Sequence, residues 1–264
     1  MRRNFVAALA LTLSVAACGG GGTTTAAKSA STSATASAST SASPSPASSA
    51  TKAPSSSNPG SAPQMSFAYV PLWPFASVAE AEQWQRDTAA GGHQPWHLDA
   101  GEVAVAFARQ YLSFTEINRV VGQTVTANDA HVSVGYTAGG TKGTAAVIHL
   151  VRIGSGAGRP WEVVGTDDTA TFSLTQPRYG STVAGTITVG GHIAGVDESI
   201  RVTARQLSVV VGSYCCLPAG APAPWSVRLP LTRTQPGPVT IVASTGGHLA
   251  AVERFTVTGV RSGS

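Results

Sequence analysis

The sequence predicts an α+β domain followed by an all-β sandwich, with an export signal and a tether in front of them. The 264-residue chain opens with an apolar segment of signal length, and a polar segment without aromatic residues follows it. Within residues 65–168, apolar residues recur first at helical spacing and then at every second position. Residues 169–260 contain seven short strand-like runs separated by Gly and Pro, without a helical pattern.

The first 17 residues have the features of an export signal. Arg2 and Arg3 supply positive charge, and Phe5–Ala17 is an apolar run too short to serve as a stable transmembrane anchor. Val15-Ala16-Ala17-Cys18 resembles the lipobox of bacterial lipoproteins. That resemblance implies a lipid thioether on the Cys18 sulfur and a mature chain that starts there; the alternative is an ordinary secretion signal with a chance cysteine.

Residues 18–64 are predicted to be the lipidated cysteine and a disordered tether. After Cys18 the segment is rich in Ser, Thr, Ala and Pro and contains no aromatic residue and no Val, Ile, Leu or Met. Such a composition cannot bury enough apolar surface to offset the entropy lost on ordering. The tether is either an unmodified spacer or a carrier of O-linked sugar.

Residues 65–168 are predicted to begin with helices. Ser77 and Glu80 form a capping-box pattern before a helix at 78–90, which Gly91 and Gly92 end. Asp99 and Glu102 mark a second helix start. The second helix is predicted to bury one apolar stripe, made of Val103, Phe107, Tyr111 and Phe114.

The rest of this domain is predicted to be an antiparallel meander. Val132, Val134 and Tyr136 alternate with polar or small residues, and β-rich runs follow at 144–153 and 161–164. Helices followed by a meander are typical of an α+β layout. In architecture this arrangement resembles the NTF2-like and cystatin-like cones, in which a curved sheet wraps around a helix.

The second domain is predicted to be a sandwich of short strands. Its strand-like runs are 171–174, 186–193, 199–206, 208–211, 225–231, 239–244 and 254–258. The segments 177–191, 225–230 and 236–241 resemble the immunoglobulin-like domain attached to bacterial spore-germination proteins. That resemblance implies an extracytoplasmic binding or spacer module. The whole chain also resembles actinobacterial envelope lipoproteins that share the Gly-His-Gln-Pro-Trp-His and Cys-Cys-x-Pro segments.

One cluster of recognition-type residues stands between the two helices. His93, Trp96 and His97 lie within six residues, and a helical metal-ligand pair is disfavoured because Pro95 separates the two histidines. The segment is predicted to be an ordered loop whose Trp96 packs on the core. The alternative is a surface recognition patch of Trp96 and the two imidazoles.

Cys215 and Cys216 are the only cysteines after Cys18. Thiols outside the cytoplasm tend to oxidise, and neither has a third folded cysteine as a partner. The alternatives are a vicinal disulfide in a tight turn, or free or intermolecular thiols. A two-cysteine zinc site is incomplete because no close histidine completes it.

Charge and motifs exclude several classes of function. The excess positive charge lies at Arg2, Arg3, Lys28 and Lys52, so residues 65–264 are neutral and no basic groove for nucleic acid is expected. No Gly-x-Ser-x-Gly motif is present, and Asp167-Asp168 is interpreted as a solvated linker rather than a calcium site. We therefore expect no catalytic residues, no cofactor and no metal ligands.

Together these features predict a lipoprotein anchored on the extracytoplasmic face of the cell membrane through Cys18. Its expected role is that of a non-catalytic binding or scaffold module, with a cell-wall polymer or an envelope protein as partner. The alternative is a small-ligand carrier or an enzyme with a pocket in the α+β domain.

Overall fold

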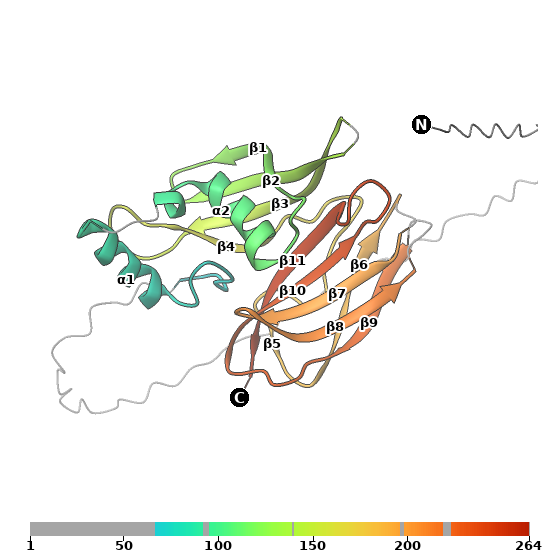
Figure 1. The fold of residues 1–264 in the computed structure, drawn as a ribbon. Helices are drawn as coiled ribbons and strands as arrows, with labels where there is room; N and C mark the ends of the chain where they lie inside the picture. The colour runs from blue at the N-terminus through green and yellow to red at the C-terminus, as the bar shows by residue number, and fades with distance from the viewer. Residues whose placement is uncertain (1–66, 92–94, 139, 196–197, 219–222, 264) are drawn as a thin grey trace, which may run out of the picture. The chain divides into compact units, whose positions relative to one another are not determined.

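The computed structural model describes residues 67–91, 95–138, 140–195, 198–218 and 223–263. This part of the chain is rich in β-strands, and its sheets are mainly antiparallel, which agrees with the predicted β-rich character (Figure 1). The predictions for the signal, Cys18, the tether and His93 lie outside the described residues. None of the described helices is both long and apolar enough to cross a membrane.

Two capped helices lie before the first sheet, as the sequence predicts. Helix α1 spans Val78–Ala89, and the Ser77 side chain accepts a hydrogen bond from the Glu80 amide at its start. Helix α2 spans Ala100–Ala106 and continues through η2, Phe107–Tyr111; the Asp99 carboxylate accepts from the Glu102 amide at 2.9 Å. A short 3-10 turn, η1 (Pro95–Leu98), precedes α2.

The first sheet is a four-stranded antiparallel meander in the order β1-β2-β3-β4. Its strands are β1 (Arg119–Val125), β2 (Asp129–Ala138), β3 (Thr141–Arg152) and β4 (Trp161–Thr166). The N-terminal arm adds a short bridge beside β4, because the Leu72 amide donates to the Val163 carbonyl at 3.0 Å and the Val163 amide donates to the Trp73 carbonyl at 2.7 Å. β1 is an additional strand that the sequence analysis does not predict.

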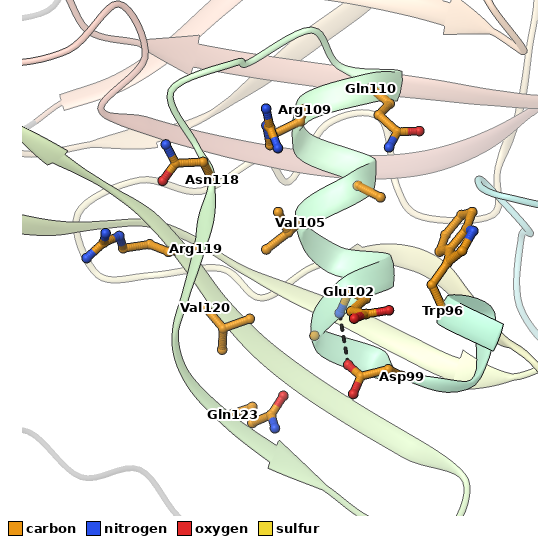
Figure 2. Close-up of a pocket in the computed structure, with 12 residues that line it drawn as sticks. Trp96, Asp99, Glu102, Val105, Arg109, Gln110, Asn118, Arg119, Val120 and Gln123 are labelled. Carbon is orange, nitrogen blue, oxygen red and sulfur yellow. Dashed lines mark hydrogen bonds between the residues drawn. The ribbon is translucent and has the colours of Figure 1, made fainter. Parts of the chain in front are cut away.

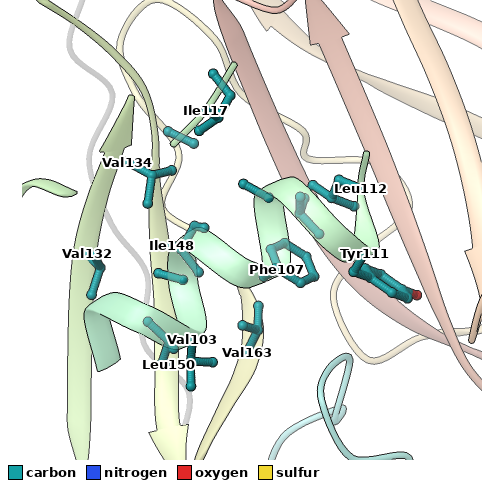
Figure 3. Packing of buried hydrophobic residues seen from close by; sticks show 14 of the residues in the cluster. Val103, Phe107, Tyr111, Leu112, Ile117, Val132, Val134, Ile148, Leu150 and Val163 are labelled. Atoms are coloured by element: carbon teal, nitrogen blue, oxygen red, sulfur yellow. The ribbon is translucent and has the colours of Figure 1, made fainter. Parts of the chain in front are cut away.

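Helix α2 covers one face of this sheet and fills the space against it with apolar side chains (Figure 3). Val103 and Phe107 of the predicted stripe are completely buried, and Tyr111 is 8% exposed. They pack among inward-facing residues of the strands, of which Figure 3 labels Val132, Val134, Ile148, Leu150 and Val163. The opposite face of β2 carries the alternate residues Asp129, His131 and Ser133.

The remaining strands form a five-stranded and a two-stranded sheet. The larger sheet has the order β5-β11-β10-β7-β8, and β6 pairs with β9. The bounds are β5 (Thr182–Val183), β6 (Thr186–Ile193), β7 (Ile200–Gln206), β8 (Val209–Leu217), β9 (Ala223–Pro230), β10 (Gly237–Thr245) and β11 (Arg254–Ser262). The predicted run at 171–174 is not a strand; Phe172 makes only an isolated bridge to Ile193.

Side chains of β10 and β11 enter the core beneath α2. Val242, Phe255 and Val257 belong to the same apolar cluster as Phe107. The buried Tyr111 hydroxyl also lies 3.0 Å from the Thr240 hydroxyl, within hydrogen-bonding distance. Residues beyond the predicted boundary at 168/169 therefore contribute to the apolar cluster of the first sheet, although most buried apolar residues of 169–260 form a second cluster.

Candidate functional site

The β2–β3 pair brings two histidines together on the sheet face opposite α2. His131 on β2 is directly across from His149 on β3, and their rings stack with centroids 4.6 Å apart and planes 8° from parallel. Both side chains are partly exposed, at 39% and 23%. Because neighbouring strands present directly opposed residues on one face, the register alone is enough to make this pair.

Two carboxylates hold these imidazoles from different sides. Asp129 Oδ1 is 3.0 Å from His131 Nε2, and Asp129 Oδ2 is 2.7 Å from His149 Nε2. Asp167, just after β4, lies on the other side of His131, with Oδ2 2.8 Å from Nδ1. One nitrogen or oxygen atom each of Asp129, His131 and His149 therefore lies within 4.8 Å of the other two.

A cavity of about 450 Å³ adjoins this cluster. His149 and Tyr69 contribute to its wall, and the edge of the Tyr69 ring packs against the His149 ring with centroids 5.8 Å apart. Arg178 and Thr166 also line the cavity. The cluster is thus accessible to a small ligand rather than enclosed in the apolar core.

A second cavity, of about 470 Å³, lies against the outer side of α2 and β1 (Figure 2). In Figure 2, Val105 and Arg109 of the α2–η2 helix face Asn118, Arg119 and Val120 across the groove. Asp99 and Glu102 lie at the other end of the helix, and Trp96 and Gln123 complete the labelled wall. The groove therefore offers acidic groups with Gln123 at one end, and Arg109 with Gln110 and Asn118 at the other (Figure 2).

The structure keeps Trp96 and His97 of the predicted recognition patch in contact, with ring centroids 3.8 Å apart, but gives them different surroundings. Trp96 is partly buried and stacks on Trp73 with centroids 5.5 Å apart. His97 is only 5% exposed and makes edge contacts with Phe75 and Trp84. Burial lowers the pKa of His97 from 6.5 to about 4. Its ring is a neutral part of a small aromatic core, whereas Trp96 also borders the groove.

Cys215 and Cys216 lie on β8, an outer strand of the five-stranded sheet, and both are exposed. The structure joins them in a disulfide across a cis peptide bond, with Cα atoms 3.0 Å apart. The pair belongs to a different sheet from β2 and β3, since β8 pairs with β7. The formation of this disulfide in the native protein stays a prediction.

A buried acid lies in β4, outside both cavities. Glu162 is completely buried, and its Oε2 accepts a hydrogen bond from the Phe75 amide at 3.1 Å. Its Oε1 has no hydrogen-bond partner among the described residues. Burial raises the pKa of this carboxyl well above its usual range, although the backbone hydrogen bond from Phe75 opposes the shift.

The sequence analysis did not select Asp129, His131 or His149. The signal available was the Asp-x-His spacing, which puts both side chains on one face of a strand. Asp167 was weighed, together with Asp168, as a calcium ligand and interpreted as part of a solvated linker. Comparison of the chain with protein-family models, with curated proteins and with solved structures finds no match.

Proposed function

We propose that this protein is a lipid-anchored extracytoplasmic binding module that holds a cell-wall polymer in the groove between α2 and β1. The observation that carries the ligand assignment is the chemistry of that groove. Trp96 offers a ring on which the apolar face of a sugar can stack. Gln110, Asn118 and Gln123 supply carboxamides that donate and accept hydrogen bonds with hydroxyl groups.

The charges in the groove favour a wall polymer that combines sugars with charged peptide or acid groups. Arg109 and Arg119 would pair with carboxylates of the polymer, and Asp99 and Glu102 with its ammonium groups. The location part of the proposal rests on Cys18 and on the small residues before it. A diacylated cysteine supplies the two lipid chains that stable anchoring requires.

The proposed architecture has two parts. We assign the helices and the β1–β4 meander to an α+β domain of the cone-like type, and β5–β11 to an immunoglobulin-like sandwich. The helix α2 lying on a four-stranded meander supports the first assignment. Greek-key-like neighbours such as β7 beside β10 support the second.

Two measurements test the function. The full lipoprotein in detergent is mixed with purified cell-wall fragments and sedimented, and R109E is compared with R228E. Arg109 borders the groove, whereas Arg228 is an exposed arginine on β9. We expect the wild type and R228E to sediment with the wall fragments. R109E should lose about 90% of the wild-type binding, which corresponds to a loss of about 1.4 kcal/mol in binding free energy.

Absence of wild-type binding, or equal losses in both variants, would refute the groove assignment. Location is tested separately by mass spectrometry and membrane fractionation. Wild-type protein should carry an acyl mass on Cys18 and stay with the membrane, and Cys18→Ala should release it. An unmodified Cys18 in a membrane-free wild-type protein would contradict the anchor.

The alternative is a small-ligand carrier or enzyme, and one observation favours it. The Asp129–His131–His149 cluster beside the 450 Å³ cavity has the polar, titratable character of ligand sites. A small molecule that copurifies with the protein, together with no retention on wall fragments, would select this alternative.

A further inference from the structure

We propose that Asp129, His131 and His149 form a binding site for a divalent transition-metal ion of the zinc class, and that Asp167 positions His131 for it. This inference is independent of the wall-binding groove, because it concerns the opposite face of the β1–β4 sheet. It also assigns a role to Asp167, which lies immediately beyond β4.

The distances between the ligand atoms are close to those of a metal polyhedron. Zinc binds imidazole nitrogen and carboxylate oxygen at about 2.0–2.2 Å, so two ligands of a tetrahedron lie about 3.3 Å apart. Here the Asp129 oxygens lie 3.0 Å from His131 Nε2 and 2.7 Å from His149 Nε2. All three ligand atoms lie within 4.8 Å of one another. Because an imidazole lone pair lies in the plane of its ring, at least one of the two stacked rings must rotate about its Cβ–Cγ bond to direct Nε2 at a shared ion.

The backbone prepares this arrangement before any ion binds. Asp129 and His131 are two positions apart on β2 and therefore share a face, and His149 is opposite His131 on β3. The nearly parallel rings present both Nε2 atoms to the same carboxylate. The backbone therefore holds the three ligand residues together before the ion binds, and the ring rotations are what ion binding has to fix.

Asp167 and Tyr69 act as the outer support of the site. The Asp167 carboxylate lies 2.8 Å from His131 Nδ1. A hydrogen bond donated by Nδ1–H to Asp167 would leave Nε2 as the nitrogen that ligates the ion. Asp167 is itself fixed, because its amide donates to the Val147 carbonyl at 2.9 Å. The Tyr69 ring restrains His149 from its edge.

The ligand types select the class of ion. Two imidazoles and one carboxylate suit zinc and neighbouring transition metals, whereas calcium and magnesium prefer a full set of oxygen ligands. With neutral imidazoles the two carboxylates contribute two negative charges, which a dication balances. Three protein ligands leave a coordination position for an exogenous ligand, and the adjoining cavity beside His149 gives such a ligand access.

The test uses the full chain in detergent, stripped of metal with a chelator. Zn²⁺ is titrated in competition with a chromophoric chelator, and Co²⁺ is added separately to record its visible absorption. We expect one equivalent of tightly bound Zn²⁺ and a Co²⁺ spectrum with nitrogen ligation. His131→Ala, His149→Ala and Asp129→Asn should each weaken Zn²⁺ binding at least about tenfold and alter the Co²⁺ bands.

The positioning role of Asp167 has its own expected result. Asp167→Asn should weaken Zn²⁺ binding about 10- to 100-fold while the stoichiometry stays at one equivalent, and Asp167→Glu should restore part of the affinity. The matched controls are His192→Ala and His248→Ala, which remove exposed histidines outside the cluster. Both controls should bind Zn²⁺ like the wild type.

Folding of each variant is checked by circular dichroism, and a thermal scan gives a second readout. Zn²⁺ should raise the melting temperature of the wild type and both controls, but not that of His149→Ala. The proposal would be overturned if the wild type bound Zn²⁺ no more tightly than His131→Ala does. It would also be overturned if His192→Ala or His248→Ala, rather than the cluster variants, lost Zn²⁺ affinity. In either case the four residues form only a network of ion pairs.

Discussion

The histidine of the buried aromatic cluster should make the fold sensitive to acid. His97 is 5% exposed, lies against Phe75 and Trp84, and has a pKa lowered to about 4 by burial. In the unfolded chain the ring titrates near its ordinary value of 6.5. The unfolded state therefore binds a proton that the folded state does not, and the free energy of unfolding falls as the pH drops from 6.5 towards 4.

The size of this effect follows from the difference between the two pKa values. At pH 5 the unfolded ring is almost fully protonated and the folded ring is mainly neutral. At about 1.4 kcal/mol per pH unit, the loss relative to neutral pH is about 2 kcal/mol. Because solvent near the cluster screens part of the penalty, we expect a loss of between about 1 and 2 kcal/mol.

The assay is urea unfolding of the wild type and His97→Phe at pH 7.5 and at pH 5. Phenylalanine keeps the aromatic contacts and removes the titrating group. A constant packing cost of the larger ring appears at both pH values and cancels in the difference. The wild type should lose about 1–2 kcal/mol more than His97→Phe on going to pH 5.

The matched control is His192→Phe, which replaces an exposed histidine on β6. This variant should follow the wild-type dependence on pH. The reasoning is refuted if the wild type and His97→Phe lose the same free energy within about 0.3 kcal/mol, since burial of His97 would then carry no proton-linked cost.

Three further predictions concern closely packed positions. Glu162 binds its proton more tightly when folded, so its contribution to the free energy of unfolding should fall as the pH rises above the usual range of glutamate, by up to about 1.4 kcal/mol per pH unit. The free energy of unfolding of the wild type minus that of Glu162→Gln should therefore decrease between pH 5 and pH 7 in urea unfolding, and a difference that stays constant with pH would contradict this prediction. Gly191→Ala should lower the free energy of unfolding by about 2 kcal/mol or more, because its Cβ would overlap the Ser173 carbonyl oxygen. Gly122 has open space around it, so Gly122→Ala should change the free energy of unfolding by less than about 0.5 kcal/mol in the same assay. Equal losses in the two variants would argue against the close approach at Gly191. Phe107→Ala should cost about 3–5 kcal/mol by thermal unfolding, since its side chain is completely buried, and a cost below about 1 kcal/mol would show that the core beneath α2 is not packed as described.

Local signals in the sequence were sufficient for the helix starts and for most strands. Ser77 and Asp99 cap α1 and α2 as their spacing to Glu80 and Glu102 predicts, because capping depends only on neighbours in the chain. The predicted run at 186–193 coincides with β6. The strand β1 was missed because its exposed residues, from Val120 onward, lack an alternating pattern.

The candidate metal cluster could not be predicted in the same way. His131 and His149 meet only because β2 and β3 pair in one particular register, and a shift by one residue would place them on opposite faces. The irregularity between Val134 and Gly135 helps to set that register, and it has no clear sequence signature. The approach of Asp167 depends in addition on where β4 ends.

The apolar cluster beneath α2 limits where the chain can be cut into fragments that fold separately. Val242, Phe255 and Val257 belong to that cluster, although they lie far along the chain from Phe107. If the chain were expressed as two fragments, divided between residues 168 and 169, each fragment would expose apolar surface that the other fragment covers in the intact protein. Each fragment should be insoluble when it is expressed alone. When the two fragments are co-expressed, they should associate and become soluble, because they fold as one cooperative unit.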